Sequence, residues 1–373
     1  MNTQIIVAGL RARPVRTAVG MLAVVLEVVL ILLLVGMANG SLADTANRVA
    51  GVGGEILVKN ADSSFMLGVS PATLPFKIGE EIAKIDGVKA AAPVVAQMEQ
   101  SGGLTMIWGI EPESFGTMSG GFNILKGKMF SSPEEAVVDD RIAADRMLKV
   151  GGPLTVLNHK FKVAGIVQSG TTGARVLIPV ETAGEMVSRP GWATFFYIKL
   201  NDKSRTKEII EKIKQKYRTE DGEPKYDVID ADEWFSMMQA SNASVLGIVF
   251  NGIVFLGVCI GVLVIFLTMY TTVSERTREI GILRAMGASK GFIVRLIIQE
   301  SLFLCFVGAI VGVGASFLLT YPLKAIWPTL NILITPDWMI RAAVFALISG
   351  VIGSLYPAYK AASQDPIEAL AYE

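Results

Sequence analysis

The sequence has 373 residues, of which 51% are hydrophobic and 18% charged, and its mean hydropathy of +0.49 is too high for an ordinary soluble domain. The formal net charge is zero, so the overall charge points to no nucleic-acid or acidic partner. Two cysteines and one histidine are too few for a disulfide framework or for a zinc site of the usual kind.

Four apolar stretches, at residues 17–38, 245–273, 293–319 and 338–356, are long enough to cross a bilayer as helices, which takes about 20 residues each. Arginines precede the first stretch, as they do in a signal peptide. Its length of about 22 residues and the lack of a clear cleavage site predict a retained membrane helix instead. We therefore expect a membrane protein with four transmembrane α-helices.

The basic residues predict the orientation of these helices. Arginines at positions 11, 13 and 16 precede the first span, four basic residues lie in the loop at 274–292, and Lys360 follows the fourth span. The connection between the third and fourth spans carries only Lys324 before Arg341. Because basic residues collect on the cytoplasmic side, both termini and the loop at 274–292 are expected there, with about residues 40–240 outside.

Three regions follow: residues 1–40 with the first span, a large α+β extracytoplasmic domain at 41–242, and residues 243–373 with spans two to four and a cytoplasmic tail. In the domain, Ile78, Ile82 and Ile85 have helical spacing, and a turn at Asn158 predicts an antiparallel hairpin. Further helices are expected at about 141–148 and 203–217, and loops at 51–54 and 119–121. Strands are expected at 55–59, 136–138, 154–157, 161–167, 176–180 and 195–200.

One segment resembles a P-loop but lacks the residues that a P-loop needs to bind a nucleotide. Gly127 and Lys128 would need a glycine at position 122 and a hydroxyl residue at 129, where the chain has Phe122 and Met129. The sequence also lacks the HExxH motif of metalloproteases. We therefore expect no catalytic, cofactor or metal residues in this chain.

One carboxylate is predicted to lie inside the membrane. Glu27 falls in the middle of the first span, where an ionised side chain is costly and often functional. The alternative is that it faces a polar seam or donates a hydrogen bond to a neighbouring helix. Small residues four apart, at Gly36/Gly40, Gly257/Gly261 and Gly308/Gly312, predict close helix packing, within the chain or in a dimer.

The cytoplasmic loop at 274–292 is predicted to form a short amphipathic helix. Ile280, Leu283 and Met286 share an apolar face after a charged entry, Gly287 can end the helix, and Ser289 can cap the next one. Such a helix either lies on the lipid surface or fits a groove of a cytoplasmic partner. The residues predicted to contact such a partner are Glu275, Arg276, Arg278, Glu279, Ile280, Gly281, Leu283, Arg284, Met286 and Gly287.

Two motifs in this half resemble those of the MacB/FtsX-like superfamily of ABC transporter permeases. The first is ERTREIG at 275–281 followed by RAMGAS at 284–289, and the second is YPAYKAA at 356–362 followed by DPIEAL at 365–370. The order of one span, a large outer domain and three further spans is also similar. Residues 135–167 resemble the periplasmic core domain of that superfamily more loosely.

The resemblance implies a permease subunit that is not itself an enzyme and that works by mechanotransmission. The fused ATPase of MacB is not in this sequence, so it implies a separate ABC ATPase dimer, which binds ATP and Mg²⁺ and contacts the loop at 274–292. A second permease copy, forming a homodimer or heterodimer, is implied as well, in a bacterial inner membrane. A periplasmic adaptor or outer-membrane partner is compatible with it.

Three functions remain open at this point. The first is export or extraction of an amphipathic substrate such as a lipid, lipoprotein, peptide or drug-like molecule. The second is regulation of a cell-wall hydrolase, as the FtsX-type relatives do, without transport. The third, from another class, is an intramembrane enzyme that uses Glu27, which lacks an evident partner acid, base or metal ligand.

Overall fold

The structure is a computed structural model that describes residues 14–61, 74–99 and 105–365. It divides into two compact units: residues 1–41, 244–325 and 330–373 form the first, and residues 42–243 with 326–329 form the second. Arg11, Arg13 and residues 366–370 of the C-terminal motif lie outside the described residues.

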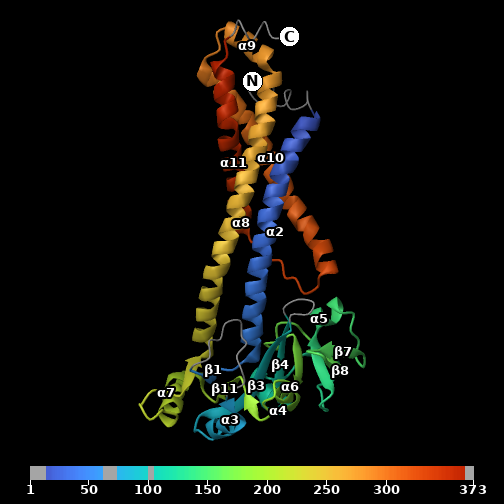
Figure 1. Ribbon diagram of the computed structural model, residues 1–373, viewed down its shortest axis with the longest axis vertical. Helices are drawn as coiled ribbons and strands as arrows, with labels where there is room; N and C mark the ends of the chain where they lie inside the picture. The colour runs from blue at the N-terminus through green and yellow to red at the C-terminus, as the bar shows by residue number, and fades with distance from the viewer. Residues whose placement is uncertain (1–13, 62–73, 100–104, 366–373) are drawn as a thin grey trace. The chain divides into compact units, whose positions relative to one another are not determined.

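The four predicted transmembrane helices are confirmed. They are α2 (Pro14–Val52), α8 (Ala231–Glu275), α10 (Lys290–Ile326) and α11 (Pro336–Ser363), the long helices in Figure 1. Each contains a segment long and apolar enough to cross a membrane. Exposed large hydrophobic side chains are concentrated on these four helices, as expected for surfaces in contact with lipid.

Two of these helices are much longer than the apolar stretches predicted. Helix α2 has 39 residues and α8 has 45, so they are about 58 Å and 68 Å long, roughly twice the hydrocarbon thickness. The loop predicted at 51–54 is wrong in its first half, because Gly51 and Val52 still belong to α2. Hydropathy marks where a helix leaves lipid, whereas the helix itself ends only where the backbone changes conformation.

The predicted close packing at small residues is confirmed within the first unit at two of the three pairs. A Cβ atom at Gly308 or Gly312 of α10 would lie 2.9 Å from a side-chain atom of Val24 or Val28 of α2. At Gly40, a Cβ would lie 1.9 Å from the carbonyl oxygen of Asn331. These glycines therefore let the backbones of neighbouring segments approach more closely than any larger residue would allow.

The second unit is an α+β domain built on a mixed sheet. The sheet has the strand order β12-β1-β11-β3-β4-β9-β6-β8-β5, with β7 paired to β8, and a separate pair joins β10 to β2. The β4–β9 and β6–β8 pairs are parallel and the others are antiparallel. The strands are β1 (Ile56–Asn60), β2 (Leu74–Pro75), β3 (Val88–Glu99), β4 (Thr105–Ile110), β5 (Ile124–Gly127), β6 (Glu135–Asp139), β7 (Pro153–Val156), β8 (His159–Val167), β9 (Val176–Pro179), β10 (Trp192–Ala193), β11 (Phe195–Leu200) and β12 (Tyr226–Asp230).

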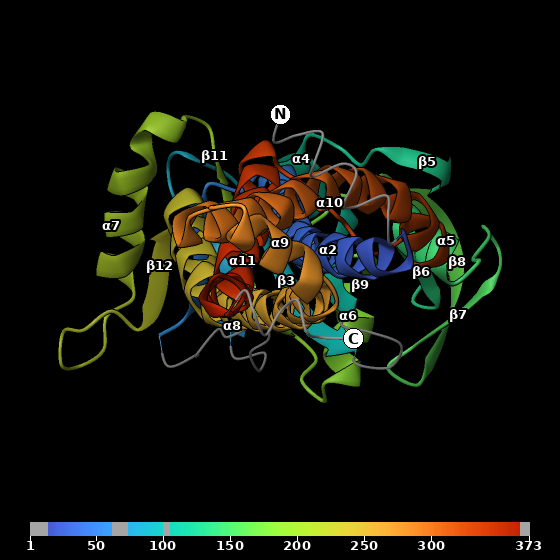
Figure 2. The same cartoon turned by 90° about the horizontal axis from the view of Figure 1, so that it is seen from above.

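Both faces of the central strands are buried. In β11, Phe195 and Tyr197 face one hydrophobic core, whereas Phe196 and Ile198 face another, with the period of two that a strand imposes. Short helices cover these cores, and α7 lies beside β12 at one edge of the sheet (Figure 2). The helices are α3 (Phe76–Ala83), α4 (Pro112–Ser119), α5 (Asp140–Asp145), α6 (Val180–Met186) and α7 (Thr206–Lys216), the last preceded by a 3₁₀ turn at Lys203–Arg205.

The predicted strands and helices of this domain are present, with ends that shift by a few residues, but several elements were missed. Strands β2, β3, β4, β5, β10 and β12 and helices α4 and α6 were not predicted. The longest strand, β3, contains four alanines and Pro93, which have low strand propensity. Its conformation therefore comes from pairing with β11 and β4 on either side.

The hairpin predicted at Asn158 is confirmed, and its turn has a defined geometry. Leu157 and Asn158 have φ values of +47° and +68° between the paired strands β7 and β8. Positive φ at both central residues is the mark of a type I′ turn, whose twist matches that of the strands.

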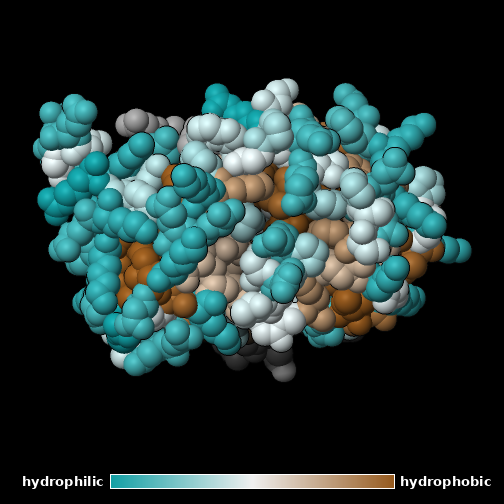
Figure 3. All heavy atoms as spheres, turned by 90° about the horizontal axis from the view of Figure 1, so that it is seen from below, coloured by the Kyte–Doolittle hydropathy of each residue, from teal (hydrophilic) through white to brown (hydrophobic). Residues whose placement is uncertain are grey.

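Most of the surface seen in Figure 3 is hydrophilic, with smaller hydrophobic areas between the polar groups.

One helix end in this domain has a residue poorly suited to its conformation. After α5, the amide of Met147 donates to Ala144 and that of Leu148 to Ala143, which is a Schellman ending with Met147 at φ +50°. Its side chain is 87% exposed, so it contributes little packing in return for the strained backbone.

Met147→Gly should therefore raise the free energy of unfolding by about 1 kcal/mol. The matched control is Gly120→Ala, at the left-handed residue after α4, where a Cβ would touch nothing within 4 Å. It should lower the free energy of unfolding by a similar amount. Chemical denaturation followed by tryptophan fluorescence checks both, and a destabilised Met147→Gly would contradict the explanation.

Candidate functional site

The helix predicted in the loop at 274–292 is present as α9 (Thr277–Ala285), and its predicted end at Gly287 and the predicted cap of the next helix at Ser289 are confirmed. Gly287 has a φ of +96°, and its amide and that of Ala288 donate to the carbonyls of Arg284 and Leu283, which is a Schellman ending. The Ser289 hydroxyl accepts from the amide of Phe292 at 3.2 Å and so caps α10. Hydrogen bonds therefore define both the end of α9 and the start of α10.

Arg276 fixes the start of α9 to a neighbouring helix. Its guanidinium lies 2.9 Å from the Glu279 carboxylate and 3.1 Å from that of Glu300 in α10. The Glu300 side chain is buried, which makes this contact shielded from water and stronger than an exposed pair. Residue spacing could not identify this pair, because Glu300 lies 24 residues after Arg276.

The sequence predicts that Ile280, Leu283 and Met286 together face lipid or a partner. This prediction is wrong for the first two, which face the chain's own core. Ile280 is 9% exposed and packs in the same core as Ile293 and Ile297, and Leu283 packs against that core. Met286, in contrast, is 72% exposed. The three positions spread over about a third of the helix circumference, so α9 can bury two against its own chain and present the third.

The remaining residues of this site surround the helix. Arg278 and Glu279 are exposed, Gly281 is buried, and Arg284 is half-buried and donates to the carbonyl of Ala288 at 3.4 Å. Glu275 is the last residue of α8. The outer face available to a partner is therefore defined by Arg278, Glu279, Ile282 and Met286, which we call the exposed face of α9.

Glu27 lies in a tight seam between three helices. Its side chain is buried, and its Oε1 atom accepts a hydrogen bond from the Ser349 hydroxyl of α11 at 2.9 Å. A Cβ atom at Gly261 of α8 would lie 2.0 Å from Oε2, so that glycine makes room for the carboxyl group. Oε2 has no hydrogen-bond partner within the described part of the chain. The polar seam is therefore present, and a functional role for Glu27 stays a prediction.

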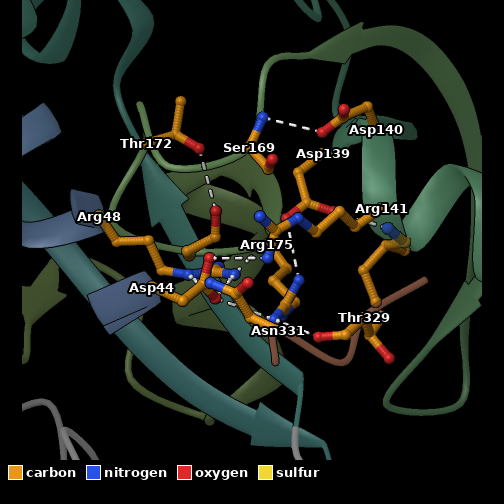
Figure 4. Close-up of polar contacts among 12 residues, drawn as sticks. Asp44, Arg48, Asp139, Asp140, Arg141, Ser169, Thr172, Arg175, Thr329 and Asn331 are labelled. Atoms are coloured by element: carbon orange, nitrogen blue, oxygen red, sulfur yellow. Dashed lines mark hydrogen bonds and ion pairs between the residues drawn. The ribbon is translucent and has the colours of Figure 1, made fainter. Parts of the chain in front are cut away.

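A buried cluster of charged residues in the second unit was not predicted (Figure 4). We call it the Asp44 cluster: Asp44, Arg48, Asp139, Arg141 and Arg175. The Asp44 carboxylate accepts from all three arginines, at 2.6 Å from Arg48, 3.0 Å from Arg141 and 3.1 Å from Arg175. It joins the last part of α2 to residues that come more than 90 positions later in the sequence.

Asp139 is the second acid of the cluster and is the more deeply buried. It accepts from the amide of Ile142 at 2.7 Å, capping α5, and lies 3.3 Å from Arg175 and 3.7 Å from Arg48. Burial raises the pKa of the Asp139 carboxyl, and the Ile142 amide and the two arginines oppose that rise. Arg175 also donates to the backbone carbonyl of Thr329 at 3.3 Å, which ties residues 326–329 to this unit.

A sequence signal for part of this cluster exists. Asp44 and Arg48 lie one helical turn apart, beyond the apolar stretch of the first span, where such a pair stabilises a helix. Nothing in the sequence marks Arg175 as their partner. Among the described residues, no group of three or more His, Cys, Asp or Glu side chains could hold a metal ion.

The Asp44 cluster should be strongly sensitive to loss of its central charge. Asp44→Asn would leave three arginines around a neutral amide, and the free energy of unfolding should fall by about 3–5 kcal/mol. The matched control is Asp86→Asn, the same change at an exposed ion pair with Arg205, which should have little effect. Chemical denaturation measures both. Equal effects would show that the cluster contributes no more than a surface pair.

The seam at Glu27 makes a separate prediction. Gly261→Ala should displace the Glu27 carboxyl group from Ser349 and lower the free energy of unfolding by about 1–3 kcal/mol. Gly257→Ala, one turn earlier in α8, is the matched control because its Cβ would come no closer than 3.8 Å to Ile31. Adding Glu27→Ala should relieve most of the Gly261→Ala effect. Thermal unfolding in detergent measures all three variants, and the absence of relief would contradict the seam.

Two sequence models of known families match the chain. The model described as "MacB-like periplasmic core domain" matches residues 17–216, which is more than half of the chain. The model described as "FtsX-like permease C-terminal" matches residues 251–366. Together they cover most of the domain, α9 and most of the four long helices, and they leave residues 217–250 unmatched.

The individual relatives have low sequence identity to this chain. An uncharacterized ABC transporter permease of Methanocaldococcus jannaschii is 26% identical over 61% of this chain and 58% of its own length. The uncharacterized ABC transporter permease YknZ of Bacillus subtilis is 33% identical over 46% of this chain and 42% of its own length. The macrolide export ATP-binding/permease protein MacB of Rhodospirillum rubrum is 26% identical over 98% of this chain and 59% of its own length.

The chain thus spans less than two thirds of the length of these relatives. Among solved structures, the periplasmic region of MacB from Actinobacillus actinomycetemcomitans gives a TM-score of 0.39 at 13% identity, covering 52% of this chain and 96% of that one.

Proposed function

Because this chain belongs to the MacB/FtsX-like superfamily of ABC transporter permeases, we propose that it couples ATP hydrolysis in an ABC ATPase to a rearrangement of its extracytoplasmic domain. In this proposal the exposed face of α9 contacts the ATPase, which binds ATP and Mg²⁺. Both termini are cytoplasmic, and the chain lies in a bacterial inner membrane. Two permease chains work with two ATPase subunits.

The observation that carries the proposal is the continuity of α8. This helix begins directly after strand β12 of the domain and ends one residue before Arg276, without a break in between. Arg276 in turn holds α9 to α10 through Glu300. A displacement of α9 is therefore passed to the sheet along one helix of 45 residues. Coupling also requires that the ATPase contact α9 differently in its ATP-bound and ATP-free states.

Export of an amphipathic substrate is the output that we propose for this coupling. Several relatives carry the words "macrolide export" in their names, and a macrolide is a largely apolar molecule with polar groups. A lipid, lipoprotein, peptide or drug-like compound has the same character. A periplasmic adaptor or outer-membrane partner would complete the path out of the cell.

The exposed face of α9 should decide whether the ATPase binds. Met286→Asp puts a charge where an apolar anchor would enter a groove, and loss of such an anchor costs about 2 kcal/mol or more, roughly 30-fold in affinity. Arg278→Ala, at the rim, should weaken binding less. Co-purification of the ATPase and its turnover in nanodiscs measure the effect.

The matched control is Met147→Asp, the same substitution at an exposed methionine of the other unit, which should leave ATPase binding unchanged. Ile280→Asp should instead destabilise the chain itself, because that side chain is buried. Full ATPase binding and turnover in Met286→Asp would overturn the role given to α9. Stimulation of turnover by an amphipathic compound supports transport, whereas a co-purifying cell-wall hydrolase without stimulation supports the regulatory function.

A further inference from the structure

A cavity of about 400 Å³ lies at the C-terminal end of α10. Helix α10 provides Phe317, Thr320, Tyr321 and Lys324, which recur at the spacing of one helix face, and the connection to α11 provides the other wall. That wall is formed by Ile332, Leu333 and Ile334. All seven residues belong to the first unit.

The second wall is held in place by backbone contacts to α2. The amide of Leu333 donates to the carbonyl of Gly36 at 2.8 Å, and the side chain of Asn331 donates to the carbonyl of Gly40 at 3.0 Å. A Cβ atom at Gly36 would lie 3.0 Å from Ile332, so the two glycines permit this approach. The cavity therefore has a fixed shape, set by a loop that cannot move away without losing these bonds.

The lining is apolar except at one place. Thr320 donates its hydroxyl to the carbonyl of Ser316 at 3.1 Å, so its polar group is already used. Lys324 is the one charged residue of the lining. Among the described residues, no carboxylate lies within ion-pair distance of Lys324 and no hydrogen bond joins it or Tyr321 to another group. The cavity thus combines apolar walls with a cation and a phenol that bond to none of the residues the structure describes.

Lys324 has an ordinary explanation, which is that a cation in the last turn of a helix interacts favourably with the helix dipole. That interaction acts through space and needs no hydrogen bond, and no such bond joins Lys324 to the last carbonyl groups in the part of the chain that the structure describes, so its ammonium group can still donate to a ligand. Arg341, near the start of α11, differs because it pairs with Asp337 at 2.9 Å and lies over Trp338. Lys324 therefore retains an unused charge beside an apolar cavity.

The position of the cavity identifies its occupant. Counted by spans, the connection between α10 and α11 lies on the same side of the membrane as the α+β domain. Lys324 comes about one turn after the apolar stretch of α10, where lysines reach the lipid headgroups, and tyrosines are enriched at this level. Phe317 lies within the apolar stretch of α10 and Ile334 adds an apolar side chain to the same cavity, so a fitting ligand has an acyl chain and a negative headgroup.

We propose that this cavity binds one anionic phospholipid of the outer leaflet, with its phosphate at Lys324 and Tyr321 and part of an acyl chain between Phe317, Ile332 and Ile334. The inference goes beyond the proposed function, from which it takes only the membrane orientation, because it requires neither the ATPase nor transport. The lipid fills the space between α10 and the connection that α2 holds. It is a resident component of the fold, distinct from any transported substrate.

Native mass spectrometry of the full chain, titrated with phosphatidylglycerol or phosphatidylcholine in detergent, tests the proposal. The tightest site should prefer phosphatidylglycerol by about tenfold, and Lys324→Gln should abolish that preference. Arg341→Gln, the matched loss of one cation at the same end of the membrane part, should preserve it. Leu333→Trp, which fills the cavity, should weaken binding of both lipids at least tenfold while thermal unfolding shows an intact fold.

Four results would overturn the proposal. The first is an undiminished preference in Lys324→Gln, and the second is an equal loss in Arg341→Gln, which would assign the effect to general surface charge. The third is displacement of the lipid by soluble glycerol phosphate, which would show that the acyl chain contributes nothing. If a second copy of the chain covers this face, Leu333→Trp would separate dimers without changing lipid binding, and that result also contradicts the proposal.

Discussion

Backbone hydrogen bonding in hydrocarbon is the constraint on which the rest of this structure depends. No water is available there, so each crossing segment must satisfy its amides and carbonyls internally, and a helix does so. Once formed, α2 and α8 continue beyond the apolar stretch and enter the domain as helices. The same element therefore serves as a membrane anchor and as part of the soluble architecture.

Helix α2 is held by one kind of contact within the membrane and by another kind beyond it. Within lipid, Gly308 and Gly312 let α10 approach the valines of α2, because close packing replaces the missing hydrophobic drive. Farther along α2, Asp44 replaces such packing with charge-assisted hydrogen bonds to three arginines. Both devices attach α2 to later parts of the chain, each by the interaction that suits its surroundings.

The sequence predicts the parts of this fold that depend on local pattern. Four apolar runs, the Asn158 turn, Gly287 and Ser289 each act through a few neighbouring residues, and each was found where it was expected. The parts that depend on distant partners were missed. Strand β3 is defined by its neighbours in the sheet, and Arg175 lies 131 residues from Asp44. The burial of Ile280 against the chain's own core was missed for the same reason. Amphipathicity shows that a helix has an apolar face, but it does not show which surface covers that face.

The attachment of the two longest helices to the sheet limits how they can move. Helix α2 leads after Val52 and three further residues into β1, and β12 leads directly into α8, while β1 and β12 are neighbouring antiparallel strands. Sliding one helix lengthwise against the other would shift that pair, and a slip of one residue, about 3.4 Å, would turn every side chain of the strand to the opposite face. Val228 and Ile56 would leave their core. A lengthwise slide of α2 against α8 that reached the sheet would therefore break the register of β1 with β12.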